Sequence, residues 1–106
     1  MKFDNINNYV RGWIFGNFEP SLLKTNEFEC SVKKYKAGDH ELKHHHKVAT
    51  EYTIVISGKV KFNDVEYGPD EIIIIEPNES VDFLCLEDAV NVVIKYPGAQ
   101  NDKYID

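Results

Sequence analysis

The stretch of sequence that decides the fold reads GDHELKHHHKVATEYTIVISG and covers residues 38–58. His44 and His46 are two residues apart in it, so on a β-strand both imidazole rings point to the same face, with backbone positions about 6.6 to 7 Å apart. Glu51 follows five residues after His46, which is enough for the chain to turn and bring the carboxylate back over the imidazoles from the neighbouring strand. His45 points to the opposite face and is given no ligand role.

Two imidazoles and one carboxylate are the donors of an open site for a divalent transition metal. Each histidine nitrogen reaches such an ion at about 2.1 Å. The competing interpretation is a solvent-exposed, histidine-rich turn that binds no ion. The spacing of His44 and His46 by itself supports the two interpretations about equally.

The stretch resembles the first cupin motif at its fixed positions, which are Gly38, His44, His46, Glu51 and Gly58. That motif consists of a glycine, five residues, His-x-His, four residues, a glutamate, six residues and a glycine, and every spacing agrees. The resemblance implies an all-β fold of the cupin type. Such a fold is a double-stranded β-helix or jelly-roll barrel, like that of the RmlC-like superfamily and its small single-domain cupin 2 proteins.

The second cupin motif is matched less completely. Gly68, Asp70 and Pro77 are in place, but Glu79 stands where the family has a glycine. Asp82 stands where the resemblance implies a histidine, the fourth metal ligand from the opposite strand.

Asp82 therefore divides the interpretations of the site. As a ligand beside His44, His46 and Glu51, it would give two nitrogens and two carboxylates, a set that suits divalent Fe, Mn, Ni or Zn better than Cu(I). Without a metal, Asp82 would accept a hydrogen bond from His44 or His46 and make that imidazole a stronger base. Cupin sugar isomerases and epimerases that lack a metal imply that the fold tolerates this second arrangement. A solvent-facing Asp82 is the third interpretation, which its apolar neighbours disfavour.

The resemblance spans about residues 28–96, and the rest of this segment predicts short strands separated by turns. An aromatic segment over residues 13–18 predicts an extra N-terminal edge strand. Residues 28–36 alternate, and we expect an apolar face and a solvent-facing row that includes Lys33. Residues 72–75 are isoleucines, apolar on both faces, which predicts packed sheets or a subunit interface.

Lys34, Glu51 and Asp82 are the candidates for catalysis. Lys34 continues the apolar face of the strand over residues 28–36, so it would meet an anionic group of a substrate at the mouth of the barrel. A lysine that snorkels to solvent is the competing interpretation. Tyr35 is one of the phenols close enough in sequence to the motif strands to serve as an acid.

Length and charge limit the remaining possibilities. With 106 residues the chain predicts one domain, residues 1–106. A net charge of −6 without a basic block, and with Arg11 as the only arginine, argues against nucleic acid and anionic membranes as partners and favours a small molecule. The N-terminus lacks the apolar core of a signal peptide, so we expect a cytoplasmic protein. Cys30 and Cys85 lie in apolar runs and are expected as free thiols.

The sequence thus predicts a small metal-dependent cupin enzyme of the isomerase, lyase or dioxygenase class. Its substrate would be a small polar or anionic metabolite, such as a sugar derivative. A non-catalytic module that binds a small molecule or metal, and a metal-free isomerase or epimerase with a His-Asp pair, are the alternatives. The surplus of apolar strand faces predicts a homodimer.

Overall fold

The computed structural model describes residues 1–106 and is built mostly from β-strands. In chain order the elements are the 3-10 helices η1 (Ile6–Asn8) and η2 (Val10–Gly12) and the strands β1 (Trp13–Phe15), β2 (Glu29–Tyr35), β3 (His40–His45), β4 (Thr50–Phe62), β5 (Val65–Tyr67), β6 (Ile72–Ile75), β7 (Val81–Tyr96) and β8 (Tyr104–Ile105). All pairings between these strands are antiparallel. The all-β prediction is confirmed.

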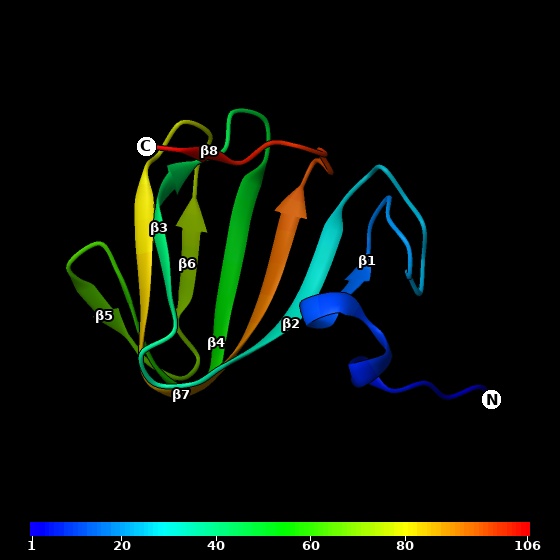
Figure 1. The fold of residues 1–106 in the computed structure, drawn as a ribbon, viewed down its shortest axis with the longest axis horizontal. Coiled ribbons are helices and arrows are strands. Elements are labelled where there is room, and N and C mark those ends of the chain that lie inside the picture. The colour runs from blue at the N-terminus through cyan, green and yellow to red at the C-terminus, as the bar shows by residue number, and fades with distance from the viewer.

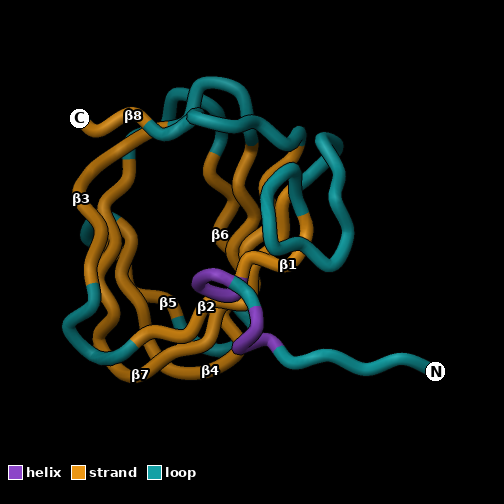
Figure 2. The backbone as a smooth tube through the Cα atoms, turned by 45° about the vertical axis from the view of Figure 1, so that its right-hand side comes forward, coloured by secondary structure: helices purple, strands orange, loops and turns teal.

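Two long strands, β4 and β7, organise the sheet and pair with each other along most of their length. The first half of β4 also pairs with β6, and its last residues pair with β5. Strand β7 pairs with β3 through its first residues and with β2 through its last ones. Because both long strands curl, the sheet folds back on itself into a barrel, in which β3 stands across from β1 (Figure 1 and Figure 2).

Gly58 makes the curl of β4 possible. Its φ is +81°, and a Cβ at this position would lie 2.2 Å from the carbonyl oxygen of Asp88 on β7. Only glycine combines this backbone conformation with so close an approach. The pairing of β4 with β7 shifts register on both sides of Gly58, where the two strands bend together. The glycine that ends the first motif therefore has a positive φ where the two long strands bend.

Apolar side chains fill one part of the barrel interior. The buried cluster consists of Val55, Val60, Phe62, Ile73, Ile75, Val81, Phe83, Cys85 and Ala89. Strand β6 contributes alternate residues to this cluster, whereas Ile72 and Ile74 are 58% and 53% exposed on its outer face. The isoleucine strand is thus covered by the protein on one face only.

Both ends of the chain add strands to the barrel. The predicted N-terminal strand is present as β1, which is shorter than residues 13–18 and pairs with β2. At the other end, β8 pairs with β3 beside the histidine triplet. Cys30 and Cys85 are free thiols, as predicted. The structure contains no helix long and apolar enough to cross a membrane.

Candidate functional site

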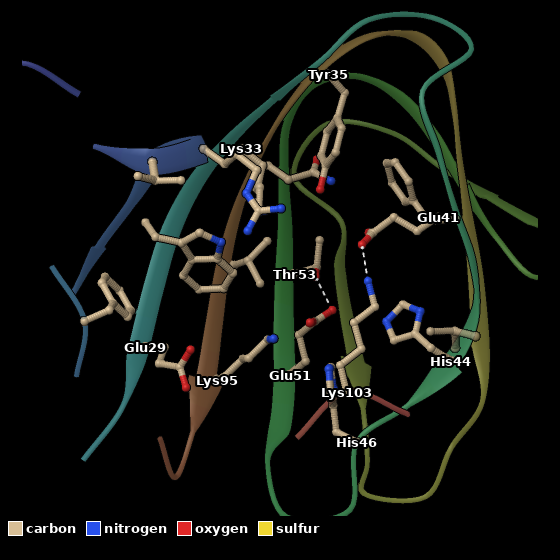
Figure 3. A pocket seen from close by; sticks show the side chains of 18 of the residues that line it. Glu29, Lys33, Tyr35, Glu41, His44, His46, Glu51, Thr53, Lys95 and Lys103 are labelled. Carbon is tan, nitrogen blue, oxygen red and sulfur yellow. Dashed lines mark hydrogen bonds and ion pairs between the residues drawn. The ribbon is translucent and has the colours of Figure 1, made fainter. Parts of the chain in front are cut away.

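A cavity of about 430 Å³ lies inside the barrel, next to the apolar core. Strands β2, β3, β4 and β7 and the N-terminal segment supply its lining (Figure 3). Its volume is in the range that holds a small metabolite. The charged side chains around it are Arg11, Lys33, Lys95, Lys103, Glu19, Glu29, Glu41 and Glu51. Four of the twelve basic residues of an acidic chain therefore converge on one cavity.

His44 and His46 are both buried and line this cavity from the end of β3 and the residue that follows it. The two ring centroids are 5.5 Å apart. The Nδ1–H of His44 donates a 2.8 Å hydrogen bond to the carbonyl oxygen of Leu42, which leaves Nε2 as the unprotonated nitrogen. The structure thus places the two histidines side by side in one cavity, and their role as metal ligands stays a prediction.

His46 is held neutral by its surroundings. Burial, followed by the positive charge of Lys95, lowers the pKa of His46 to about 4. Its Nε2 atom is buried without a hydrogen-bond partner. A buried ring nitrogen of this kind is free to bond a ligand.

Glu51 lies in the same cavity, on the first half of β4. The strand register places Lys95 of β7 directly between Glu51 of β4 and Glu29 of β2. Burial raises the pKa of Glu51, although the charge of Lys95 opposes the shift. The hydroxyl of Thr53 donates a 3.3 Å hydrogen bond to its carboxylate. Glu51 is therefore a partly buried carboxylate of increased basicity, and Figure 3 shows it in the cavity beside Lys95.

His45 lies outside this group, as its place in the triplet predicts. Its Nδ1 is 2.7 Å from a carboxylate oxygen of Asp106, and its ring stacks on Tyr104 at 5.4 Å. Both partners belong to the C-terminal segment, so His45 fastens β8 to β3.

Asp82 is not brought to the histidines. Its neighbours Val81 and Phe83 are buried and line the cavity, and alternation along β7 turns the Asp82 side chain to the outer face. The spacing from Pro77 in the second motif predicts that Asp82 faces the histidines. In the structure Val81, one residue earlier, pairs with His44. The ligand role and the His-Asp pair assigned to Asp82 both lack a structural basis.

Lys34 is also misplaced by the sequence prediction, for a related reason. The face of β2 that was expected to meet solvent lines the cavity, where it presents Glu29, Lys33 and Tyr35. Lys34 is exposed on the opposite side and does not line the cavity. The part of the interior that β2 faces is a polar cavity, so the polar row of this alternating strand points inward.

Asn91, which was assigned no role, and Tyr35, one of the phenols considered as an acid, both line the cavity. Asn91 pairs with Lys33 in the register of β2 and β7, and it is only 1% exposed. Its Oδ1 atom, like Nε2 of His46, is buried without a hydrogen-bond partner. Burial raises the pKa of Tyr35, so its phenol keeps the proton and remains a donor. In the sequence, Asn91 stands out as a polar amide within the valine-rich run of residues 90–93, which is the pattern that could have indicated its role.

The donors partly fit a transition metal. Two imidazoles and a carboxylate suit such an ion, and the unpartnered Nε2 of His46 is a free donor. However, no three His, Cys, Asp or Glu side chains lie close enough together to hold an ion between them. The carboxylate of Glu51 bonds Thr53 instead. As placed here, the three side chains do not form a closed metal site.

No protein-family model and no curated protein sequence matches the chain. Solved structures match its fold. A protein with a double-stranded β-helix domain from Klebsiella pneumoniae is 18% identical, with a TM-score of 0.73 over 98% of this chain and 90% of that one. The lyase DddQ from Ruegeria pomeroyi, which acts on DMSP, is 13% identical, with a TM-score of 0.73 over 88% of this chain and 49% of that one.

A sugar phosphate isomerase of the cupin superfamily from Silicibacter pomeroyi is 15% identical, with a TM-score of 0.61 over 66% of this chain and 50% of that one. This chain thus spans about half the length of the lyase and of the isomerase. At these identities the likeness establishes the fold. The chain has the cupin-type double-stranded β-helix that the first motif predicts, and this is a fold that several kinds of enzyme use.

Proposed function

We propose that the protein is a cupin enzyme of the isomerase or lyase type, which moves a proton on a small hydroxylated anion bound inside the barrel. One observation carries this proposal. A single cavity brings together the partly buried carboxylate of Glu51, the oriented imidazole of His44 and several lysines. Such a combination of base, proton carrier and cations is what proton abstraction next to a carbonyl or carboxylate requires.

Glu51 is the proposed base in this scheme. Burial raises its pKa, which makes the carboxylate a stronger base. Lys95 lies next to it across the strands and stabilises the negative charge that develops on the substrate. His44, with its tautomer fixed by Leu42, presents Nε2 as an acceptor for the proton of a substrate hydroxyl, and Glu51 returns the proton that it took from carbon.

The interior favours a substrate with hydroxyl groups. Oδ1 of Asn91 and Nε2 of His46 are buried polar atoms without partners, and a ligand hydroxyl would restore the missing hydrogen bonds. Sugar acids and sugar phosphates have this chemistry, and the isomerase with the same fold acts on a sugar phosphate by its name.

Turnover assays with a panel of sugar acids and sugar phosphates test the proposal. We expect at least one compound to be converted, with kcat reduced about 100-fold or more in Glu51→Gln, in line with loss of a general base. Asp82→Asn, on the outer face, is the matched control and keeps full activity. Conversion that is equal in Glu51→Gln and the wild type would refute the assigned role of Glu51, and a panel that binds without conversion would favour a non-catalytic module.

Metal binding at His44, His46 and Glu51 is a second candidate, which the unpartnered Nε2 of His46 favours. A bound divalent ion would act as a Lewis acid on the substrate. Mass spectrometry of the native protein, purified without an affinity tag, measures this directly. If His44, His46 and Glu51 bind a metal, we expect one transition-metal ion per chain. That ion should be lost in His44→Gln and in His46→Gln. Retention of the ion by both variants would exclude this site.

A further inference from the structure

Three cations that line the cavity form no ion pair with a carboxylate. The chain forms four ion pairs, which are Lys24–Glu19, His45–Asp106, Lys59–Glu66 and Lys103–Glu41. Lys103 in the cavity is thus neutralised by Glu41. Arg11, Lys33 and Lys95 line the same cavity and appear in none of these pairs.

Two of these cations, Lys33 and Lys95, lie near the same aromatic ring, that of Trp13. The Nζ atoms of Lys33 and Lys95 lie 4.8 and 5.2 Å from the centroid of its ring. These lysines come from different strands, β2 and β7, so they approach the same ring from two directions. A cation near an aromatic ring is partly stabilised, and two cations around one ring make this part of the cavity attractive to an anion.

The N-terminal segment that carries Arg11 and Trp13 is firmly seated on β2. Gly12 has a φ of +75°, and a Cβ there would lie 1.9 Å from the carbonyl oxygen of Val32. The hydroxyl of Ser31 donates a 3.1 Å hydrogen bond to the carbonyl oxygen of Arg11. These contacts fix the segment against the barrel, so the approach of Arg11 to the cavity is built into the fold.

We propose that Arg11, Lys33 and Lys95, beside Trp13, form a subsite that binds the carboxylate or phosphate group of the substrate. The inference rests on the proposed function and extends it, because it orients the substrate. An anion among these side chains would be attracted by their positive charges and form charge-assisted hydrogen bonds to them. Since Lys95 pairs with Glu51 across the strands, the carbon next to that anion would lie beside the proposed base.

Anion binding tests the subsite without any turnover. Isothermal titration with inorganic phosphate and with gluconate, at pH 7 and constant ionic strength, measures the affinity of the wild-type chain for each kind of anion. We expect at least one to bind, and Kd to rise about tenfold in Lys33→Gln and in Lys95→Gln, as for the loss of a charge-assisted hydrogen bond. Tighter binding of phosphate would indicate a phosphorylated substrate, and tighter binding of gluconate a carboxylated one.

Two further variants separate charge at the site from charge in general. Lys34→Gln removes the same charge from the exposed side of β2 and should leave Kd unchanged, whereas Lys33→Arg keeps the charge and should bind within about threefold of the wild type. Circular dichroism confirms that each variant is folded. Equal affinities in the wild type, Lys33→Gln and Lys95→Gln, or no binding of either anion, would overturn the subsite.

The subsite and the proposed function fail separately. If the variants lose anion binding as expected but no compound is converted, the subsite stands and the enzymatic proposal falls. If a substrate is converted at the same kcat and KM by the wild type and by both Lys→Gln variants, the enzyme stands and the subsite falls.

Discussion

His46 illustrates how a single buried side chain links this site to stability. Its folded pKa of about 4 lies below the ordinary 6.5, so the folded state resists protonation of the ring. As pH falls through 6.5, the unfolded chain takes up a proton at His46 and the folded chain does not. Stability is therefore lost between about pH 6.5 and pH 4. The loss is complete below the folded pKa.

We expect this loss to disappear in His46→Gln. Between pH 7 and pH 4, the wild type should lose up to about 3 kcal/mol of unfolding free energy relative to the variant. Urea unfolding of chelator-treated protein at several pH values measures the difference, and Glu51 contributes equally to both chains. Parallel stability curves for the two proteins would show that His46 titrates normally.

At the scale of elements, the connection from β3 to β4 depends on a residue far along the chain. The carboxylate of Asp102 accepts hydrogen bonds from the backbone N–H groups of Lys47, Val48 and Ala49, with distances of 2.9 to 3.2 Å. Burial raises its pKa, but these hydrogen bonds outweigh burial and hold the pKa of Asp102 below its usual value. The loop between His46 and Glu51 is fixed in this way.

Asp102→Asn should loosen that loop and lower stability. An amide accepts hydrogen bonds more weakly than a carboxylate and has only one oxygen, so we expect a loss of about 2–3 kcal/mol at pH 7. The wild-type advantage should shrink as pH falls below 3.8 and through the lowered folded pKa. Thermal unfolding at pH 7 and at pH 3 measures both effects. A variant as stable as the wild type at pH 7 would contradict the assigned role of Asp102.

The bend of β4 gives a second prediction at this scale. Gly58→Ala places a Cβ against the backbone of β7 in a left-handed conformation, and we expect a loss of about 3–5 kcal/mol or failure to fold. Gly38→Ala is the matched control, because Gly38 has a φ of +96° but open space around it. It should cost only about 1 kcal/mol. Equal losses in the two variants, by chemical denaturation, would show that contact with β7 is unimportant.

Local sequence spacing predicts some features of these strands correctly, and others depend on tertiary packing. Gly58 and the pair of His44 and His46 depend on local spacing, so the motif places them correctly. Which alternate side chains of β2 and β7 face the interior depends instead on whether that interior is apolar or polar. An apolar core would put Val32 inside, but a polar cavity puts Lys33 there, and no local pattern distinguishes the two. Tertiary packing thus decided the positions where the prediction was wrong.

Arg11 and Trp13 lie outside the cupin motifs, so the resemblance could not assign them a role. They reach the cavity because Gly12 lets the N-terminal segment press against β2. Arg11, Lys33 and Lys95 come from the N-terminal segment, β2 and β7, and these segments are far apart in sequence. Only the pairing of these strands brings Lys33 and Lys95 to one tryptophan.

At the scale of the whole molecule, the outer face of β4 and β6 is apolar and uncovered. Ile72, Ile74 and Ile56 are each more than half exposed, and Tyr52 lies next to Ile74 in the strand register. Neighbouring apolar side chains on adjacent strands form a surface suited to association. We expect a homodimer that buries this face, which agrees with the prediction from the isoleucine run.

Light scattering after size exclusion at micromolar concentration tests this expectation. The wild type should have twice the mass of one chain, and Ile74→Lys should have the mass of one chain with unchanged anion affinity. A monomeric wild type would contradict the expected dimer. A dimeric Ile74→Lys variant would place the interface elsewhere.

The central claim is that the polar interior of the barrel removes a proton from a bound hydroxylated anion, with Glu51 as the base. Proton NMR in D₂O measures this step directly, through loss of the C–H signal next to the carbonyl or carboxylate of a sugar acid or sugar phosphate. The account predicts that the wild type exchanges this hydrogen for deuterium and that Glu51→Gln does so at least about 100-fold more slowly. Exchange at the wild-type rate in Glu51→Gln, or no exchange with any compound that the cavity binds, would contradict it.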